Sequence, residues 1–175
     1  MLDRMLLPTL ALAALLFAAG CAPVISKGLR EQADKNLTFE AALRDPGAHA
    51  GKTVVWGGVL VSAKHLGEGT LLEIVQKPLD FQLCPKETDR SGGRFLALYN
   101  GYLDAAIYEK GREVTLAGVI RGERVLPMDE IEYAYPLVDI REIFLWEPEE
   151  NARYYPYPYP YWQSPGYYRF HGGPP

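Results

Sequence analysis

The chain has 175 residues, of which 48% are hydrophobic and 23% are charged, and its formal net charge is −4. This length allows one ordinary domain with appendages, and the apolar share is large enough for a packed core, which excludes disorder of the whole chain. The negative net charge argues against a function dominated by contacts with nucleic-acid phosphates. Two cysteines are too few for a disulfide-stapled mini-protein or a four-cysteine zinc site.

Residues 1–20 have the pattern of an export signal. After Asp3 and Arg4 the chain is apolar from Met5 to Ala19. This run is shorter than the ~20 residues that a membrane-spanning helix needs, and it contains Pro8. The pattern therefore predicts a cleaved signal peptide over 1–20, with a buried helix as the alternative.

The end of this segment, Ala18-Ala19-Gly20-Cys21, resembles a bacterial lipobox. The resemblance implies that signal peptidase II cleaves between Gly20 and Cys21, and that Cys21 carries a covalent diacylglycerol and an N-acyl chain. Two or three acyl chains anchor a protein stably where one would not. Because Ala22 is not the Asp that favours retention in the inner membrane, we expect a lipid anchor in the outer membrane, facing the periplasm. A plain signal peptide, cleaved at a neighbouring small residue, is the alternative.

Residues 21–36 are expected to form a lipidated linker, and a short helix is predicted from Phe39 to Arg44. Thr38 is a suitable N-cap, and Glu40 in the first turn favours the positive end of the helix dipole. The sequence Asp45-Pro46-Gly47 ends the helix. Phe39 and Leu43 are four residues apart, so they share a face that can cover the end of a barrel.

Strand signals recur at short intervals after this helix, separated by turn residues. The pair Gly57-Gly58 inside the first run predicts a bulge or a sharp coil. Val114, Leu116, Gly118 and Ile120 alternate on one face of the fourth run. We also expect polar loops over 78–93 and 121–132, and a short helix over 100–109. The five predicted strands are 52–62, 70–76, 94–99, 113–120 and 137–146.

Five strands with a short helical segment between the third and fourth match the order of an OB-like barrel. The predicted fold class is therefore mainly β: a small five-stranded OB-like barrel with one or two short helices, over residues 37–147. An unrelated sandwich or an open meander is the alternative.

Several short motifs in this order resemble the Slp (starvation lipoprotein) family. The family resemblance covers 37–147 and implies an outer-membrane lipoprotein of Gram-negative bacteria with no established enzymatic reaction, so it transfers no catalytic residues. In members of the family a Pro often follows the Asp equivalent to Asp104, whereas this chain has Ala105. The motifs are Val55-Trp56-Gly57-Gly58, Leu72-Glu73-Ile74, Pro78-Leu79-Asp80, Gly93-Arg94-Phe95, Gly101-Tyr102-Leu103-Asp104, Gly111-Arg112, Val114-Thr115, Gly118, Tyr135-Pro136 and Trp146.

The pattern predicts neither a catalytic nor a metal site. His49, His65 and His171 have no partners at ligand spacing. A functional pair among the carboxylates Glu73, Asp80 and Asp104 is conceivable, but acidic residues in strands and turns are more often solvated. Cys84 stands beside Pro85 without a nearby His, which favours an inert or intermolecularly bridged thiol over a nucleophile. We therefore expect no enzyme and no cofactor besides the lipid on Cys21.

Five residues are the candidates for a ligand face, because aromatic side chains on an OB-type barrel can stack on bases or sugars. The alternative is that Trp56 and Tyr102 pack in the core. The negative net charge and the expected location in the cell envelope favour a glycan or a lipid over nucleic acid as the ligand. The five candidates are Trp56, Arg94, Tyr99, Tyr102 and Tyr108.

Residues 148–175 are rich in Pro and Tyr, which alternate from Tyr155 to Tyr161, and are predicted to form a disordered, extended tail. Tyr and Trp suit amphipathic contacts, so the tail could contact cell wall, membrane or a partner protein. The expected function is that of a non-enzymatic structural or interaction lipoprotein, held to the membrane by its lipid and contacting envelope proteins or peptidoglycan. A glycan- or lipid-binding module is the alternative, and the oligomeric state is left open.

Overall fold

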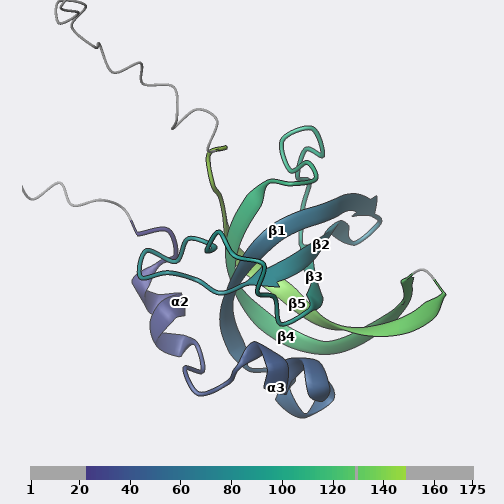
Figure 1. The fold of residues 1–175 in the computed structure, drawn as a ribbon, viewed down its shortest axis with the longest axis horizontal. Helices are drawn as coiled ribbons and strands as arrows, with labels where there is room; N and C mark the ends of the chain where they lie inside the picture. The colour runs from purple at the N-terminus through teal and green to yellow at the C-terminus, as the bar shows by residue number, and fades with distance from the viewer. Residues whose placement is uncertain (1–22, 129, 149–175) are drawn as a thin grey trace, which may run out of the picture.

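The computed structural model describes residues 23–128 and 130–148, and these form a closed five-stranded barrel with short helices beside it (Figure 1). The strand order around the barrel is β1-β2-β3-β5-β4; β3 and β5 run parallel, and all other neighbours are antiparallel. The predicted mainly β, OB-like class is confirmed. The strands are β1 Thr53–Leu66, β2 Gly69–Lys77, β3 Arg94–Tyr99, β4 Glu113–Met128 and β5 Ile131–Leu145.

The barrel interior is filled by side chains that alternate along each strand, as the period of a strand requires. Phe95, Leu116 and Ile120 are at most 1% exposed, and Val114 is fully buried on the same face of β4 as predicted. The interior is therefore a packed core, and a ligand has to bind on the outside of the barrel or at its ends.

The predicted helix over Phe39–Arg44 is confirmed as α3, and Thr38 caps it by accepting a hydrogen bond from Ala41 N at 3.2 Å. Its apolar face covers one end of the barrel. Phe39 makes edge contacts with Trp56 and Phe95, with ring centroids 4.9 and 5.9 Å apart. A 3-10 helix, η1, follows over Gly47–His49.

The segment expected to be a linker is part of the domain over the residues that the structure describes. Residues 23–36 include helix α2, Lys27–Gln32, and Ile25 just before it is fully buried. Asp34 N donates to Thr53 O at 2.9 Å, and Ser26 N donates to Glu142 Oε2 at 2.7 Å. These contacts join the segment to the start of β1 and to β5. Ile25 and Leu29, four residues apart, were the signal for this packing.

The predicted polar loop over 121–132 is wrong. There β4 continues to Met128 and β5 begins at Ile131, and the two pair from Gly122↔Leu137 to Met128↔Ile131. This two-stranded ribbon, here called the arm, extends from the barrel on the right of Figure 1. Exposed and half-buried residues alternate along its β4 strand, and the exposed set combines the charged Arg121 and Glu123 with the apolar Val125.

The predicted helix over 100–109 is also absent from that stretch, where the chain forms turns instead. Thr70 is fully buried and organises them: its Oγ1 donates to Gly101 O at 2.9 Å and accepts from Leu103 N at 3.0 Å. The two α-helices of the described residues both precede β1, so their number matches the prediction and their position does not.

Gly57 and Gly58 lie within a continuous strand, and the irregularity in the β1–β2 register falls later, between Leu60 and Ser62. Gly58 instead allows the backbones of β1 and β2 to approach closely. A Cβ at Gly58 would lie 1.9 Å from Val75 O, which no side chain can occupy without moving a strand.

No helix within the described residues is both long and apolar enough to cross a membrane. The predicted signal peptide, Cys21 and the tail from residue 149 onward lie outside the described residues.

Gly58→Ala is expected to destabilise the barrel by about 1–3 kcal/mol, because the new methyl group forces β1 and β2 apart. Gly28→Ala is the matched control: it lies in α2 with nothing within 4 Å of the added Cβ, and Ala favours helix over Gly. Urea unfolding of both variants measures the difference. Equal stabilities would contradict the proposed role of Gly58.

Thr70→Val is expected to cost about 1–3 kcal/mol, because it leaves the buried Leu103 N–H and the partly buried Gly101 C=O without their partner. Thr70→Ser keeps the hydroxyl and should lose much less. Thermal unfolding compares the two, and a Val variant as stable as the Ser variant would show that the hydroxyl does not hold the 100–111 turns.

Candidate functional site

The described chain begins at one pole of the barrel, on the side opposite to the arm (Figure 1). Pro23 and Val24 line a shallow hollow of about 330 Å³ together with Arg30, Phe81 and Trp146. Cys21 is two residues before Pro23 in the sequence, and two residues of extended backbone span at most about 7 Å. This surface is here called the anchor pole.

Phe81 is the most exposed large apolar side chain of the described residues, at 91%. It is displayed by a tight loop in which Asp80 Oδ1 accepts hydrogen bonds from Gln82 N and Cys84 N, both at 2.8 Å. Leu83 in this loop has φ 68°, a left-handed conformation that costs energy in a branched residue. A locally strained and bonded loop therefore holds an apolar ring toward solvent.

The loop is fixed to the barrel wall by a chain of hydrogen bonds. Thr115 Oγ1, in a fully buried residue of β4, donates to Leu83 O at 2.6 Å and accepts from Trp146 Nε1 at 3.0 Å. Phe81 was not singled out by the sequence, where it is one apolar residue in a polar stretch.

A larger pocket of about 750 Å³ lies next to the hollow and shares Arg30 and Leu83 with it. It is here called the seam pocket, because it lies where β1 and β2 are not yet paired. β1 pairs with β4 from Thr53 onward, but with β2 only from Gly57 onward. The stretch of β1 before Gly57 therefore has no strand beside it on the β2 side, and α2 and the 78–83 segment stand around the opening.

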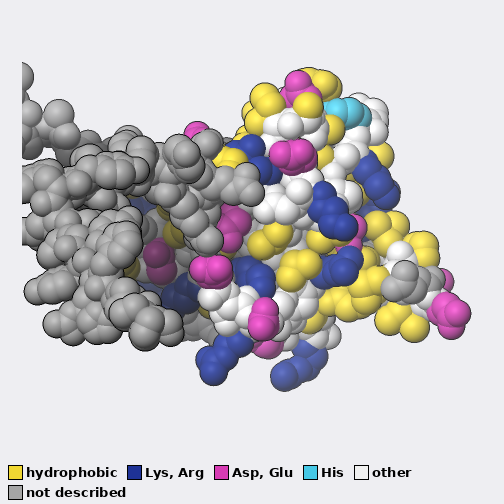
Figure 2. Space-filling view, turned by 45° about the horizontal axis from the view of Figure 1, so that its top comes forward, with side chains coloured by type: hydrophobic (Ala, Val, Ile, Leu, Met, Phe, Trp, Pro, Cys, Tyr) yellow, Lys and Arg dark blue, Asp and Glu magenta, His cyan; other side chains and the backbone are white. Residues whose placement is uncertain are grey.

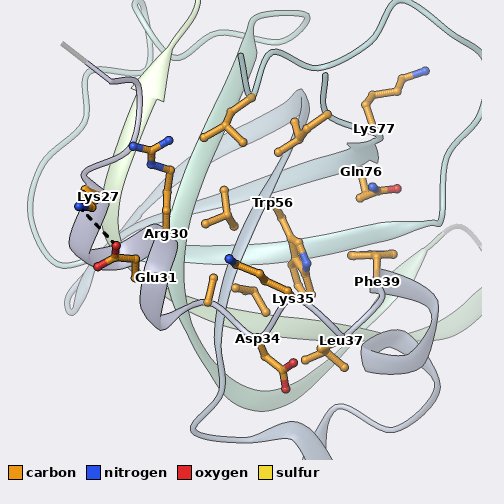
Figure 3. Close-up of a pocket in the computed structure, with 15 residues that line it drawn as sticks. Lys27, Arg30, Glu31, Asp34, Lys35, Leu37, Phe39, Trp56, Gln76 and Lys77 are labelled. Carbon is orange, nitrogen blue, oxygen red and sulfur yellow. Dashed lines mark ion pairs between the residues drawn. The ribbon is translucent and has the colours of Figure 1, made fainter. Parts of the chain in front are cut away.

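The back of the seam pocket is apolar. Figure 3 shows Trp56 in the middle of the view, between Lys35 on the α2 side and Phe39 on the other. Trp56 is only 6% exposed, and its ring is 5.4 Å from that of Phe95. Further apolar lining comes from Leu37, Val54, Leu79 and Leu83.

The rim of the seam pocket carries an excess of positive charge. Its two acids are already engaged: Glu31 pairs with Lys27 at 3.7 Å, and Asp34 pairs with Lys52 at 3.0 Å. The hydrogen bond from Lys52 lowers the pKa of Asp34 below its ordinary value, so the carboxylate stays charged and paired.

Three further cations line the rim. Lys77 donates to the backbone carbonyl of Thr88. Arg30 and Lys35 form no ion pair with any acid among residues 23–128 and 130–148. They were missed by the sequence analysis because they fall in the segment expected to be a linker.

The five predicted ligand-face residues do not share one surface. Trp56 packs in the core and forms the back of the seam pocket. Tyr99 lies four residues beyond Phe95 on β3, about 13 Å along the strand, and packs against the core with Tyr108. Burial raises the pKa of the Tyr108 phenol, and Tyr99 nearby adds to the rise.

The other two predicted residues lie elsewhere. Tyr102 is 72% exposed and stacks on His65 at 4.6 Å, beside the β1–β2 turn. Arg94 is on the outside of β3, where its Nη1 is 2.7 Å from Glu73 Oε1. Burial, followed by the charge of Glu73, raises the pKa of Tyr135 beside this pair. The predicted face is thus divided among distinct places on the barrel.

The carboxylates considered for acid–base chemistry each have a structural role. Glu73 pairs with Arg94, Asp80 holds the Phe81 loop, and Asp104 accepts from Ala106 N at 2.9 Å in the turn after β3. Within the described ranges no three His, Cys, Asp or Glu side chains gather in a way that could hold a metal ion.

Figure 2 shows one face of the molecule, on which Lys and Arg are interspersed with Asp and Glu. Hydrophobic side chains gather toward the arm in this view. The exposed apolar residues of the arm are Val125 and Ile131, at 49% and 58%.

Comparison with known proteins agrees with the resemblance stated above. The family model of the outer membrane lipoprotein Slp family matches residues 18–171. Outer membrane protein Slp of Escherichia coli K12 is 32% identical over 163 residues, which cover 90% of this chain and 86% of that protein. The uncharacterized lipoprotein YeaY of the same organism is 26% identical over a match that covers 90% of this chain and 78% of that protein.

Among solved structures, a small single-stranded DNA-binding protein from Streptomyces coelicolor is similar at a TM-score of 0.34 and 14% identity, over 54% of this chain and 94% of that one. The match to the family model extends over most of the sequence and includes the predicted lipobox. The chain belongs to the Slp family of outer membrane lipoproteins.

Proposed function

We propose that this outer membrane lipoprotein is a non-enzymatic interaction module, tethered through acyl chains on Cys21 so that its anchor pole rests against the periplasmic surface of the bilayer. One observation carries the proposal: Pro23 and Val24, next to the lipidation position, lie beside the rigidly displayed Phe81 and beside Arg30. An apolar ring with a nearby cation suits the boundary between acyl chains and phosphates.

The short length of chain between Cys21 and Pro23 supports this contact in the tethered state. With about 7 Å of backbone between Cys21 and Pro23, the hollow cannot stand far from the headgroups while the acyl chains are inserted. In this orientation the side of the barrel opposite the anchor pole, which includes the arm, is the surface available to other envelope components such as proteins or peptidoglycan.

The role of the described acids supports a function without catalysis. Glu73 on β2 is paired with Arg94, whereas Asp80 and Asp104 accept backbone hydrogen bonds in two separate loops. Their positions are explained by folding.

Cys21→Ser is expected to move the protein from the outer-membrane fraction to the soluble periplasmic fraction, because serine cannot accept the thioether-linked lipid. Cys84→Ser, which removes the other thiol, should leave the protein in the membrane. Fractionation with palmitate labelling measures both. A Cys21→Ser protein that still fractionates with the outer membrane would overturn the proposed anchor.

The orientation has its own test in proteoliposomes that contain brominated phospholipid, with tryptophan as the reporter of depth. F81W is expected to show stronger bromine quenching than the wild type, because position 81 lies at the bilayer surface. I131W, at the arm on the far side, should show no additional quenching. The reverse pattern would mean that the arm, and not the anchor pole, faces the lipid.

A further inference from the structure

The seam pocket lies at the edge of β1 that β2 leaves uncovered, between that edge and α2. Its back consists of core residues such as Trp56, yet a volume of about 750 Å³ is left between them and α2. Pockets of about 300–1,000 Å³ with an apolar lining and a few convergent polar groups are typical of small-molecule sites.

We propose that the seam pocket binds the acyl chain of an anionic phospholipid, with the phosphate held at the α2 side of the rim by Arg30 and Lys35. The proposed ligand class deepens the function above and rests on it, since the lipid comes from the leaflet to which the protein is tethered.

The charge of the rim selects the sign of the ligand. The whole chain has a net charge of −4, whereas the pocket lining has four cations and two acids, and both acids already have cation partners. Arg30 presents a guanidinium suited to bidentate contact with phosphate, and Lys35 presents a point charge. Figure 3 places both on the α2 side of the pocket.

The lining selects the rest of the ligand. Behind the rim the lining is mostly aliphatic or aromatic: Leu79 and Leu83 contribute to it, and Trp56 lies at the back. A small hydrophilic anion would leave this surface in contact with water, while an acyl chain covers it. Charge and lining together indicate an amphiphile.

The position of the pocket indicates that the lipid ligand comes from the membrane to which the protein is tethered. Arg30 and Leu83 belong both to the seam pocket and to the hollow that contains Pro23 and Val24. The pocket is therefore adjacent to the anchor pole, and a lipid of the same leaflet can reach it over a short path.

The test titrates the soluble Cys21→Ser protein with lysophosphatidylglycerol of 14 carbons, kept below its critical micelle concentration, in a calorimeter. Saturable one-to-one binding is expected. Lysophosphatidylcholine with the same chain and glycerol phosphate without a chain should each bind at least tenfold more weakly. Equal binding of the zwitterionic lipid would overturn the role of the cations, and equal binding of glycerol phosphate would overturn the role of the apolar lining.

Two variants locate the binding. R30Q combined with K35Q should weaken lysophosphatidylglycerol at least tenfold, whereas R44Q combined with K110Q, an equal change of charge at exposed positions outside the pocket, should not. A33F places a ring in the pocket at a half-buried position and should abolish binding. If circular dichroism shows that A33F is unfolded, the R30Q/K35Q double variant alone tests whether the lipid binds in the seam pocket.

Absence of binding by all three probes would overturn the proposed ligand. It would not affect the proposed outer-membrane anchor, because the titration uses a protein without its lipid. Conversely, a Cys21→Ser protein that remains in the outer membrane would overturn the proposed anchor, and the titration would then use that protein after extraction with urea and refolding.

Discussion

Three aromatic rings at the α3 end of the barrel hold together parts of the chain that no strand pairing joins. Phe39 from α3, Trp56 from β1 and Phe95 from β3 form three edge contacts with centroids 4.9 to 5.9 Å apart. Such pairs add to the free energy gained by burying their area. They fix α3 over the barrel end and at the same time make two of the lining residues of the seam pocket, so the core and the candidate site share the same side chains.

The seam pocket follows from the way β1 is shared between its neighbours. A strand that pairs with β4 along its first half and with β2 along its second half must leave one edge open where the second pairing has not begun. In this chain α2 and the Phe81 loop stand at that edge without filling it. Because α2 is the first helix of the described residues, the opening lies close to the point where the described chain begins at Pro23.

Local patterns predicted most of the barrel. The strand cores, the Thr38 cap and the apolar face of β4 were all readable, because period-two alternation and capping depend on residues a few positions apart. The arm was mistaken for a loop, since its charged residues hide an alternation that becomes visible only when β5 lies opposite. The turns at 100–111 were mistaken for a helix, because the buried hydroxyl of Thr70, thirty residues earlier, decides their course.

The candidate site was harder to predict than the fold. Of the five residues proposed for a ligand face, only Trp56 reaches the seam pocket, and the rim cations lie in a segment that composition alone marked as a linker. By itself the sequence determined the barrel class and the family, and it predicts the export and lipidation signals, since all of these depend on local order and collinear motifs. The tertiary structure alone decided that α2 packs on the barrel, that the aromatic residues are dispersed and that an apolar pocket opens beside the anchor pole. These properties arise from contacts between residues far apart in the chain, which no window of sequence contains.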